Sequence, residues 1–151
     1  MIVILEGAPG SGKTTYAKHL RTTAQKLNGG FVFSYRYPRP KCYADFRKAL
    51  RQIETLISRT SINDLLILDR HPLISQPIFA PYTFRCKCEG ALIASQIVYC
   101  NPGLETIRAN RPNSIFFPHF AEILNAYDET MNEYKKGFDV KDFDYTRPWI
   151  E

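Results

Sequence analysis

The 151-residue sequence has few features of membrane, secreted or disordered proteins. Its four cysteines, at positions 42, 86, 88 and 100, are too few and too unevenly spaced for a disulfide scaffold, so we expect a reducing, cytoplasmic setting. No apolar run approaches the roughly 18 residues that span a bilayer, so we expect no membrane protein. The first six residues lead directly into a glycine motif, so we expect no signal peptide. Hydrophobic residues make up 44% of the chain, enough to exclude a disordered polymer.

Positive charge is concentrated in one segment. The segment Tyr35–Arg51 holds six basic residues and one acid, so its net charge equals the +5 of the whole chain. The basic residues are Arg36, Arg39, Lys41, Arg47, Lys48 and Arg51. A local cluster of this kind indicates an anionic partner at one place, although a solvated basic helix face carries the same charge.

The order of apolar and amphipathic segments predicts an α/β fold. Short apolar runs predict strands at Ile2–Glu6, Phe31–Ser34, Leu65–Asp69 and Gln96–Cys100, with a fifth within Phe138–Tyr145. Helical patterns cover Lys13–Leu27 (ended by Asn28, Gly29 and Gly30), Tyr43–Ser58, Leu104–Asn110 and a long segment after Pro118. This last segment has a stripe of apolar residues, which is typical of core packing, at Phe120, Ile123, Leu124, Tyr127, Met131 and Tyr134. The alternation predicts one domain, residues 1–151, with a parallel sheet of four to five strands and helices on both faces.

The strongest motif lies between the first predicted strand and helix. Residues 7–14, GAPGSGKT, match the phosphate-loop pattern G-x-x-x-x-G-K-[ST] at every fixed position. Glycines let backbone N–H groups wrap a phosphate, and the helix N-terminus adds partial positive charge. We expect Lys13 to reach the β- and γ-phosphates of ATP, to face solvent in the empty loop, and the Thr14 hydroxyl to coordinate Mg²⁺. The predicted ATP-binding residues are Gly7, Ala8, Pro9, Gly10, Ser11, Gly12, Lys13, Thr14 and Thr15.

A second metal ligand is expected at the end of the third predicted strand. Asp69 closes that strand and lies beside the phosphate loop if the first and third strands are neighbours. A carboxylate there can hold Mg²⁺ directly or through water. The alternative is an aspartate that caps the segment after the strand.

The sequence around Asp69 narrows the type of phosphate-loop protein. No N-K-x-D tetrapeptide, which reads guanine in GTPases, occurs in the chain, and a helicase needs more residues. The segment Asp69-Arg70-His71-Pro72 resembles the Asp-Arg-His-Pro segment of herpesvirus-type thymidine kinases and is similar to the corresponding segment of thymidylate kinases. The resemblance implies a P-loop deoxynucleoside or thymidylate kinase, in which Arg70 and His71 contact the acceptor and Asp69 lies near the metal.

A second match follows the fourth predicted strand. Residues 104–112, LETIRANRP, look like the start of the arginine-bearing lid of these kinases, and the helix with Tyr127 resembles the helix after that lid. The resemblance implies that Arg108 and Arg111 fold over the transferred phosphoryl group, in a short lid near residues 108–117. Two solvated arginines at a helix C-terminus are the alternative.

The chain departs from nucleoside kinases after its second predicted strand. Those enzymes carry an acid there that takes the proton of the acceptor hydroxyl, whereas residues 33–40, FSYRYPRP, contain none. A monophosphate acceptor needs positive charge instead, which Arg36, Arg39 and Lys41 offer. Both acceptors therefore stay open, with Asp45 or Asp69 as the base for a hydroxyl.

The base pocket and the cysteine pair give weaker signals. Gln52, beside Arg51, falls near the region that reads the base in thymidylate kinases, although a surface glutamine is the more common case. Aromatic residues that can stack a base, or simply fill the core, are Tyr35, Tyr37, Tyr43, Phe46 and Phe79. The Cys86-x-Cys88 pair lacks the further ligands of a zinc site.

Together these patterns predict an ATP- and Mg²⁺-dependent kinase of deoxynucleosides or deoxynucleoside monophosphates, with pyrimidines favoured. Lys13, Asp69, Arg70, Arg108 and Arg111 are its candidate catalytic residues. The basic segment keeps a polynucleotide 5′-hydroxyl kinase as the alternative, and the short lid and absent acid keep an inactive nucleotide-binding regulator. The expected partner is a small-molecule nucleoside or nucleotide, with a nucleic-acid acceptor for the alternative activity; a homodimer stays open.

Overall fold

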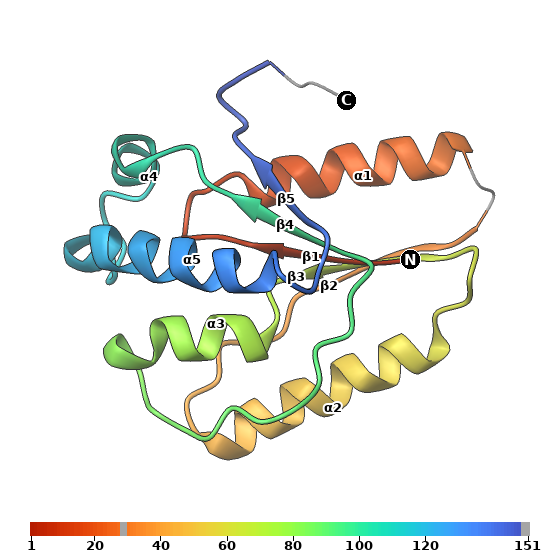
Figure 1. Ribbon diagram of the computed structural model, residues 1–151, viewed down its shortest axis with the longest axis horizontal. Helices are drawn as coiled ribbons and strands as arrows, with labels where there is room; N and C mark the ends of the chain where they lie inside the picture. The colour runs from red at the N-terminus through yellow and green to blue at the C-terminus, as the bar shows by residue number, and fades with distance from the viewer. Residues whose placement is uncertain (28–29, 149–151) are drawn as a thin grey trace.

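Five parallel strands form one sheet with helices on both faces (Figure 1). The computed structural model describes residues 1–27 and 30–148. The strands are β1 (Ile2–Glu6), β2 (Val32–Tyr35), β3 (Leu65–Asp69), β4 (Gln96–Cys100) and β5 (Val140–Phe143). The helices are α1 (Lys13–Leu27), α2 (Tyr43–Arg59), α3 (Pro72–Phe79), α4 (Leu104–Asn110) and α5 (Phe120–Tyr134), with short 3₁₀ turns at Ala80–Tyr82 and Phe117–His119. No helix in the described ranges is long and apolar enough to cross a membrane.

The sheet order is β2-β3-β1-β4-β5, so β1 lies in the middle between β3 and β4. Every neighbouring pair is parallel, which requires a crossover between strands and explains why helices alternate with strands along the chain. The register pairs Leu5 with Asp69 and Glu6 with Tyr99. The carboxyl ends of the three central strands therefore meet at one edge of the sheet. The predicted α/β fold is confirmed.

Alternate residues of the central strands pack on opposite faces. Ile4, Leu68 and Ile97 belong to the core that α2, α3 and α5 cover. Val3, Ile67 and Val98 belong to the smaller core under α1. This division follows from the two-residue repeat of a strand, and it explains why buried strands read as continuous apolar runs.

Most predicted elements lie within one residue of their observed bounds, and one helix was not predicted. The sequence pattern gave no helix over Pro72–Phe79, where α3 forms with Pro72 in its first turn and Pro77 inside it. Pro72 fits because the first N–H groups of a helix have no intrahelical partner. Pro77 lies on the exposed side of the helix. Asn28 and Gly29, which the sequence predicts to end α1, lie outside the described residues.

Candidate active site

The phosphate loop, residues 7–14, connects β1 to α1 as its motif requires. Its Gly12 has φ of +96°, a conformation that favours glycine. A Cβ at this position would also lie 2.5 Å from Cδ1 of Tyr145, a residue that follows β5. Gly12 is therefore required both by the turn and by the aromatic ring packed on it.

Lys13 is buried rather than facing solvent, and that expectation was wrong. Its Nζ donates hydrogen bonds to the carbonyl oxygens of Gly7 at 3.3 Å and Ala8 at 3.0 Å, and to Ser11 Oγ at 3.2 Å. Burial, together with the charge of nearby Arg70, lowers the pKa of Lys13 to about 7.

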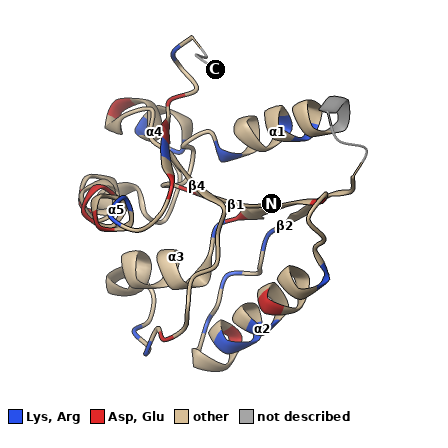
Figure 2. Ribbon diagram, turned by 45° about the vertical axis from the view of Figure 1, so that its right-hand side comes forward, with Lys and Arg blue, Asp and Glu red and all other residues tan. Residues whose placement is uncertain are grey.

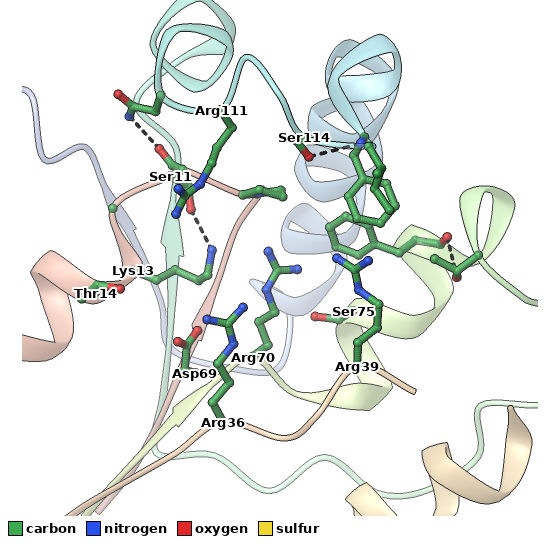
Figure 3. A pocket seen from close by; sticks show the side chains of 18 of the residues that line it. Ser11, Lys13, Thr14, Arg36, Arg39, Asp69, Arg70, Ser75, Arg111 and Ser114 are labelled. Carbon is green, nitrogen blue, oxygen red and sulfur yellow. Dashed lines mark hydrogen bonds between the residues drawn. The ribbon is translucent and has the colours of Figure 1, made fainter. Parts of the chain in front are cut away.

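A cavity of about 1000 Å³ opens beside the loop at the carboxyl edge of the sheet (Figure 3). The loop residues from Pro9 onward line it, together with Thr15. Five cationic side chains lie around this space, and Asp69 is the only acid among the described residues that line it. The cations are Lys13, Arg36, Arg39, Arg70 and Arg111. Such an excess of positive charge in a cleft attracts polyanionic ligands such as nucleotides.

Asp69 and Thr14 have the chemistry of a Mg²⁺ site. Both line the cavity, and Asp69 ends β3 beside the loop, as the strand order requires. The Oδ1 atom of Asp69 is buried and has no hydrogen-bond partner among the described residues. Buried carboxylate oxygens need a partner, and a hard cation with oxygen ligands supplies one. These residues therefore fit the metal.

Arg70 and Arg39 lie against an aromatic wall of the cavity. The guanidinium carbon of Arg70 lies 4.9 Å from the ring centre of Phe79, and that of Arg39 lies 4.8 Å from the ring centre of Phe116. The two rings contact each other, with centres 5.1 Å apart. The wall thus holds two cations over apolar surface, and a flat base can pack on the same surface.

The C-terminal end of α4 and the residue after it cover the tip of the phosphate loop. Asn110 Nδ2 donates to the carbonyl oxygen of Gly10 at 3.0 Å and to the hydroxyl of Tyr145 at 2.6 Å. A Cβ on Gly10 would lie 2.8 Å from Cγ of Arg111. Arg111 therefore lies directly over the loop, whereas Arg108, on α4, is half-buried and does not line the cavity.

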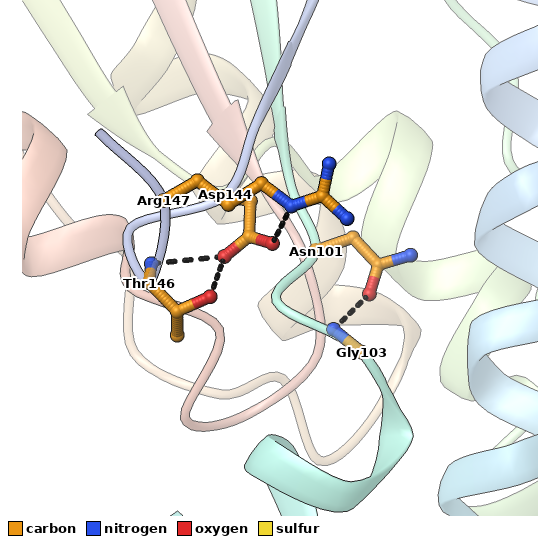
Figure 4. A network of polar contacts seen from close by, with 5 residues as sticks. All are labelled: Asn101, Gly103, Asp144, Thr146 and Arg147. Atoms are coloured by element: carbon orange, nitrogen blue, oxygen red, sulfur yellow. Dashed lines mark hydrogen bonds and ion pairs between the residues drawn. The ribbon is translucent and has the colours of Figure 1, made fainter. Parts of the chain in front are cut away.

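Tyr145, which packs on Gly12, lies in a short turn after β5. Figure 4 shows the polar contacts of its neighbours Asp144, Thr146 and Arg147. Asp144 Oδ1 accepts hydrogen bonds from the backbone N–H of Thr146 at 2.9 Å and its hydroxyl at 2.5 Å. Asp144 Oδ2 lies 3.4 Å from Arg147 Nε. In the neighbouring turn after β4, Asn101 accepts a bond from the Gly103 N–H at 2.9 Å. Both turns follow strands whose ends border the loop.

Five predicted site residues lie outside the cavity lining: Gly7, Ala8, Gln52, His71 and Arg108. Gly7 and Ala8 form the start of the phosphate loop, where their carbonyl oxygens accept hydrogen bonds from Lys13. Gln52 lies on the exposed side of α2, where its amide oxygen accepts a hydrogen bond from the hydroxyl of Tyr35. His71 is buried at the start of α3, where its Nδ1 accepts a bond from the N–H of Leu73 at 3.1 Å. Burial lowers the pKa of His71 to about 4, so the ring is neutral at pH 7. His71 thus serves as a helix cap.

The sequence interpretation missed several residues that the fold brings to this site. Glu6 is fully buried beneath it, and Tyr127, expected only as core, contacts Glu6. Tyr145, Asn110 and Phe116 line the cavity. The signal for Glu6 was present, because an acid that ends a wholly apolar strand is expensive to bury without partners. Tyr145 and Asn110 gave no such signal.

The cysteine pair has no further metal ligands grouped with it among the described residues. The sulfur atoms of Cys86 and Cys88 lie 3.9 Å apart. Burial and the neighbouring thiol raise the pKa of Cys88 to about 11, which disfavours the thiolate that binds zinc. Within residues 1–27 and 30–148 no three His, Cys, Asp or Glu side chains are grouped to hold a metal.

Solved structures share this fold. One is deoxyadenosine kinase from M. mycoides with bound dATP, with a TM-score of 0.61 and 14% identity over 98% of this chain and 93% of that one. Another is the YorR protein from Bacillus subtilis in complex with phosphorylated GDP, with a TM-score of 0.57 and 18% identity over 97% of this chain and 87% of that one. No protein-family model matches the sequence, and a search among curated proteins finds no relative.

Proposed function

We propose that this chain is an ATP- and Mg²⁺-dependent phosphotransferase that acts on deoxynucleosides or deoxynucleoside monophosphates, with the monophosphate preferred. The observation that carries the proposal is the cavity beside the phosphate loop, which is lined by five cations and one carboxylate. A donor triphosphate and an acceptor phosphate together bring the negative charge that such a cavity needs. The folds of deoxyadenosine kinase with bound dATP and of a GDP-bound protein support a nucleotide ligand.

In this proposal the residues divide into a donor side and an acceptor side. The loop N–H groups and Lys13 hold the donor phosphates, with Arg111 over the loop. Asp69 and Thr14 hold Mg²⁺, which when bound neutralises charge on the phosphates and orients them. Arg70, Arg36 and Arg39 hold the acceptor phosphate, whose oxygen receives the γ-phosphoryl group as ADP leaves.

The absence of a second lining acid favours the monophosphate over the nucleoside. A hydroxyl acceptor needs a base, and Asp69 is the only carboxylate at hand among the described lining residues. A phosphate acceptor is already ionised and needs only positive charge. Thymidylate is the first candidate because of the resemblance carried by residues 69–72 to thymidine and thymidylate kinases.

A substrate panel tests the proposal directly. The protein is incubated with Mg²⁺, [γ-³²P]ATP and each deoxynucleoside or deoxynucleoside monophosphate, purines included. We expect the fastest transfer to a monophosphate, and none in Lys13→Ala. Lys18→Ala, which changes an exposed lysine of α1, is the control. Nucleotide binding without transfer to any acceptor would indicate an inactive regulator instead.

One observation favours polynucleotide acceptors as the second candidate. Arg47, Lys48 and Arg51 are exposed on α2 and do not line the cavity, so a polymer can contact them outside it (Figure 2). Phosphate contacts of this kind make binding fall steeply with salt. A 5′-hydroxyl oligonucleotide that is phosphorylated faster than any monomer, with a steep salt dependence, would favour this activity.

A further inference from the structure

Glu6 is an acid with no exposure to solvent, located where β1 ends and the phosphate loop begins. It does not line the cavity, so it does not contact a ligand there directly. Its Oε1 accepts hydrogen bonds from the N–H of His71 at 2.8 Å and Ser75 Oγ at 2.7 Å. Its Oε2 accepts from the hydroxyl of Tyr127 at 2.8 Å and contacts the same Ser75 at 2.9 Å. One carboxylate therefore ties the end of β1 to both α3 and α5.

Arg70 adopts a backbone conformation that must be held in place. Its φ is +74°, and no other non-glycine residue in the described ranges has a positive φ. Side chains disfavour this conformation, which persists only where surrounding groups enforce it. The Arg70 N–H donates to the carbonyl oxygen of Leu5 at 2.8 Å, and the next N–H, that of His71, donates to Glu6. The peptide groups on both sides of Arg70 are thus fixed to β1.

The side chain of Arg70 is connected to the same carboxylate. Its Nη1 lies 3.5 Å from the hydroxyl of Tyr127, which donates its own hydrogen to Glu6. The guanidinium group lies over the Phe79 ring on one side of the cavity (Figure 3). The positive charge of Arg70 also favours the ionised form of Glu6, although burial raises the pKa of this carboxyl.

We propose that Glu6 is a positioning residue that fixes the backbone of Arg70 and aims its guanidinium group into the cavity to receive the acceptor. The acceptor part rests on the function proposed above; the positioning part does not. Glu6 makes its hydrogen bonds to the N–H that follows Arg70 and to Tyr127, so its main contribution belongs to the acceptor. On the donor side its charge also raises the pKa of Lys13, but it is the weakest of the influences on that group.

The first test measures the side chain of Arg70 itself, independently of any reaction. In the ¹⁵N NMR spectrum the Nε–H signal of Arg70 is identified by its loss in Arg70→Lys. We expect restricted motion of this group in the wild type and fast motion in Glu6→Gln, which keeps the shape but lacks the charge and one acceptor oxygen. An equally restricted Arg70 in both proteins would overturn the proposal.

The second test separates acceptor from donor. In Glu6→Gln we expect the KM of a deoxynucleoside monophosphate to rise about tenfold, and the Kd of ATP to change less than twofold. In the Arg70→Ala background the same substitution should add nothing, because the residue acts through Arg70. Additive effects, or an equal loss of ATP binding, would contradict it. If the wild-type protein transfers no phosphate to any acceptor, the proposed function is wrong. The NMR measurement then still tests whether Glu6 positions Arg70.

A milder substitution tests the same link in case Glu6→Gln fails to fold. Tyr127→Phe removes only the hydroxyl between Glu6 and Arg70, and we expect mobile Arg70 and a threefold or larger rise in acceptor KM. Tyr134→Phe changes a half-buried tyrosine of the same helix that makes no hydrogen bond to Glu6 among the described residues, and it should leave both unchanged. Identical behaviour of the two tyrosine variants would exclude the link through Tyr127.

Discussion

The side-chain nitrogen of Lys13 donates a hydrogen bond of 3.0 Å to the carbonyl oxygen of Ala8, within the loop that the lysine serves. In the proposed function, Lys13 therefore exchanges contacts with its own loop for contacts with a ligand phosphate. Since burial lowers its pKa to about 7, the cation is only partly formed at neutral pH before a phosphate arrives. Both properties bear on how nucleotide binding responds to pH.

ATP affinity should fall as the pH rises from 7.5 to 9. Only protonated Lys13 attracts phosphate, and bound phosphate raises the pKa of Lys13. The affinity for ATP is therefore highest below pH 7 and falls by up to about tenfold per pH unit above it. Titration calorimetry in two buffers of different ionisation heat should show proton uptake on binding. Lys13→Arg keeps the charge at every pH and should lose this dependence. Constant affinity from pH 7.5 to 9 would contradict the prediction.

Removing both charges in Arg36→Ala/Arg39→Ala should raise the KM for thymidylate roughly tenfold or more. A hydrogen bond to a charged group contributes about 1.5–3 kcal/mol, and both arginines line the cavity. Steady-state kinetics should show little change for ATP and a smaller change for thymidine, which brings no charge. The control Arg47→Ala/Arg51→Ala changes exposed charges of α2 outside the cavity. Small, equal effects on thymidine and thymidylate would mean that Arg36 and Arg39 do not bind an acceptor phosphate.

Asp69→Asn should raise the Mg²⁺ concentration needed for half-maximal activity. Even outer-sphere partners of a metal contribute roughly tenfold or more to affinity, and Asp69 offers a buried carboxylate oxygen with no other partner among the described residues. Nucleotide binding without Mg²⁺ should be nearly unchanged. Asp142→Asn, an exposed acid on β5, is the control. An unchanged Mg²⁺ requirement would remove Asp69 from the metal site.

Gly12→Ala should destabilise the fold by about 1–3 kcal/mol beyond the effect of Gly103→Ala. Both glycines have φ near +100°, so both variants bear the backbone cost of about 1–2 kcal/mol. Only at Gly12 does the new methyl group meet a neighbour, the ring of Tyr145, since nothing lies within 4 Å at Gly103. Urea unfolding measures the difference. Tyr145→Ala should recover part of it, and equal losses in the two glycine variants would show that no clash exists.

The fold was predictable because its strands are buried on both sides. Runs such as Leu65–Asp69 can be recognised as strands without knowing which strands pair. The position of Asp69 beside the phosphate loop was predicted on the assumption that the first and third strands are neighbours. Helix α3 was missed because Pro72 and Pro77 suppress the helical signal, and only the structure shows that Pro72 falls in the first turn and Pro77 on the exposed side.

The candidate site was predictable where the chain supplies it locally. The phosphate loop and residues 69–70 are contiguous in sequence, and the structure brings Arg36, Arg39 and Arg111 to the same cavity. The orientation of side chains could not be predicted, because it depends on tertiary neighbours. Lys13 turns inward to its loop carbonyls, and His71 turns away to cap α3.

Tyr145 packs on Gly12, so this contact joins a residue synthesised early in translation to one synthesised near its end. Gly10 likewise takes its bond from Asn110, 100 residues later, and Glu6 from Tyr127, 121 residues later. Contacts of such long sequence separation cannot form before both partners have been synthesised, and the entropy of closing so long a loop makes them slow to form. When the phosphate loop of a nascent chain emerges from the ribosome, the residues that will pack around the loop have therefore not yet been synthesised. Under the proposed function, a nucleotide finds its complete site only once the residues near position 145 have been synthesised, so the earlier sheet and helices fold without that stabilisation.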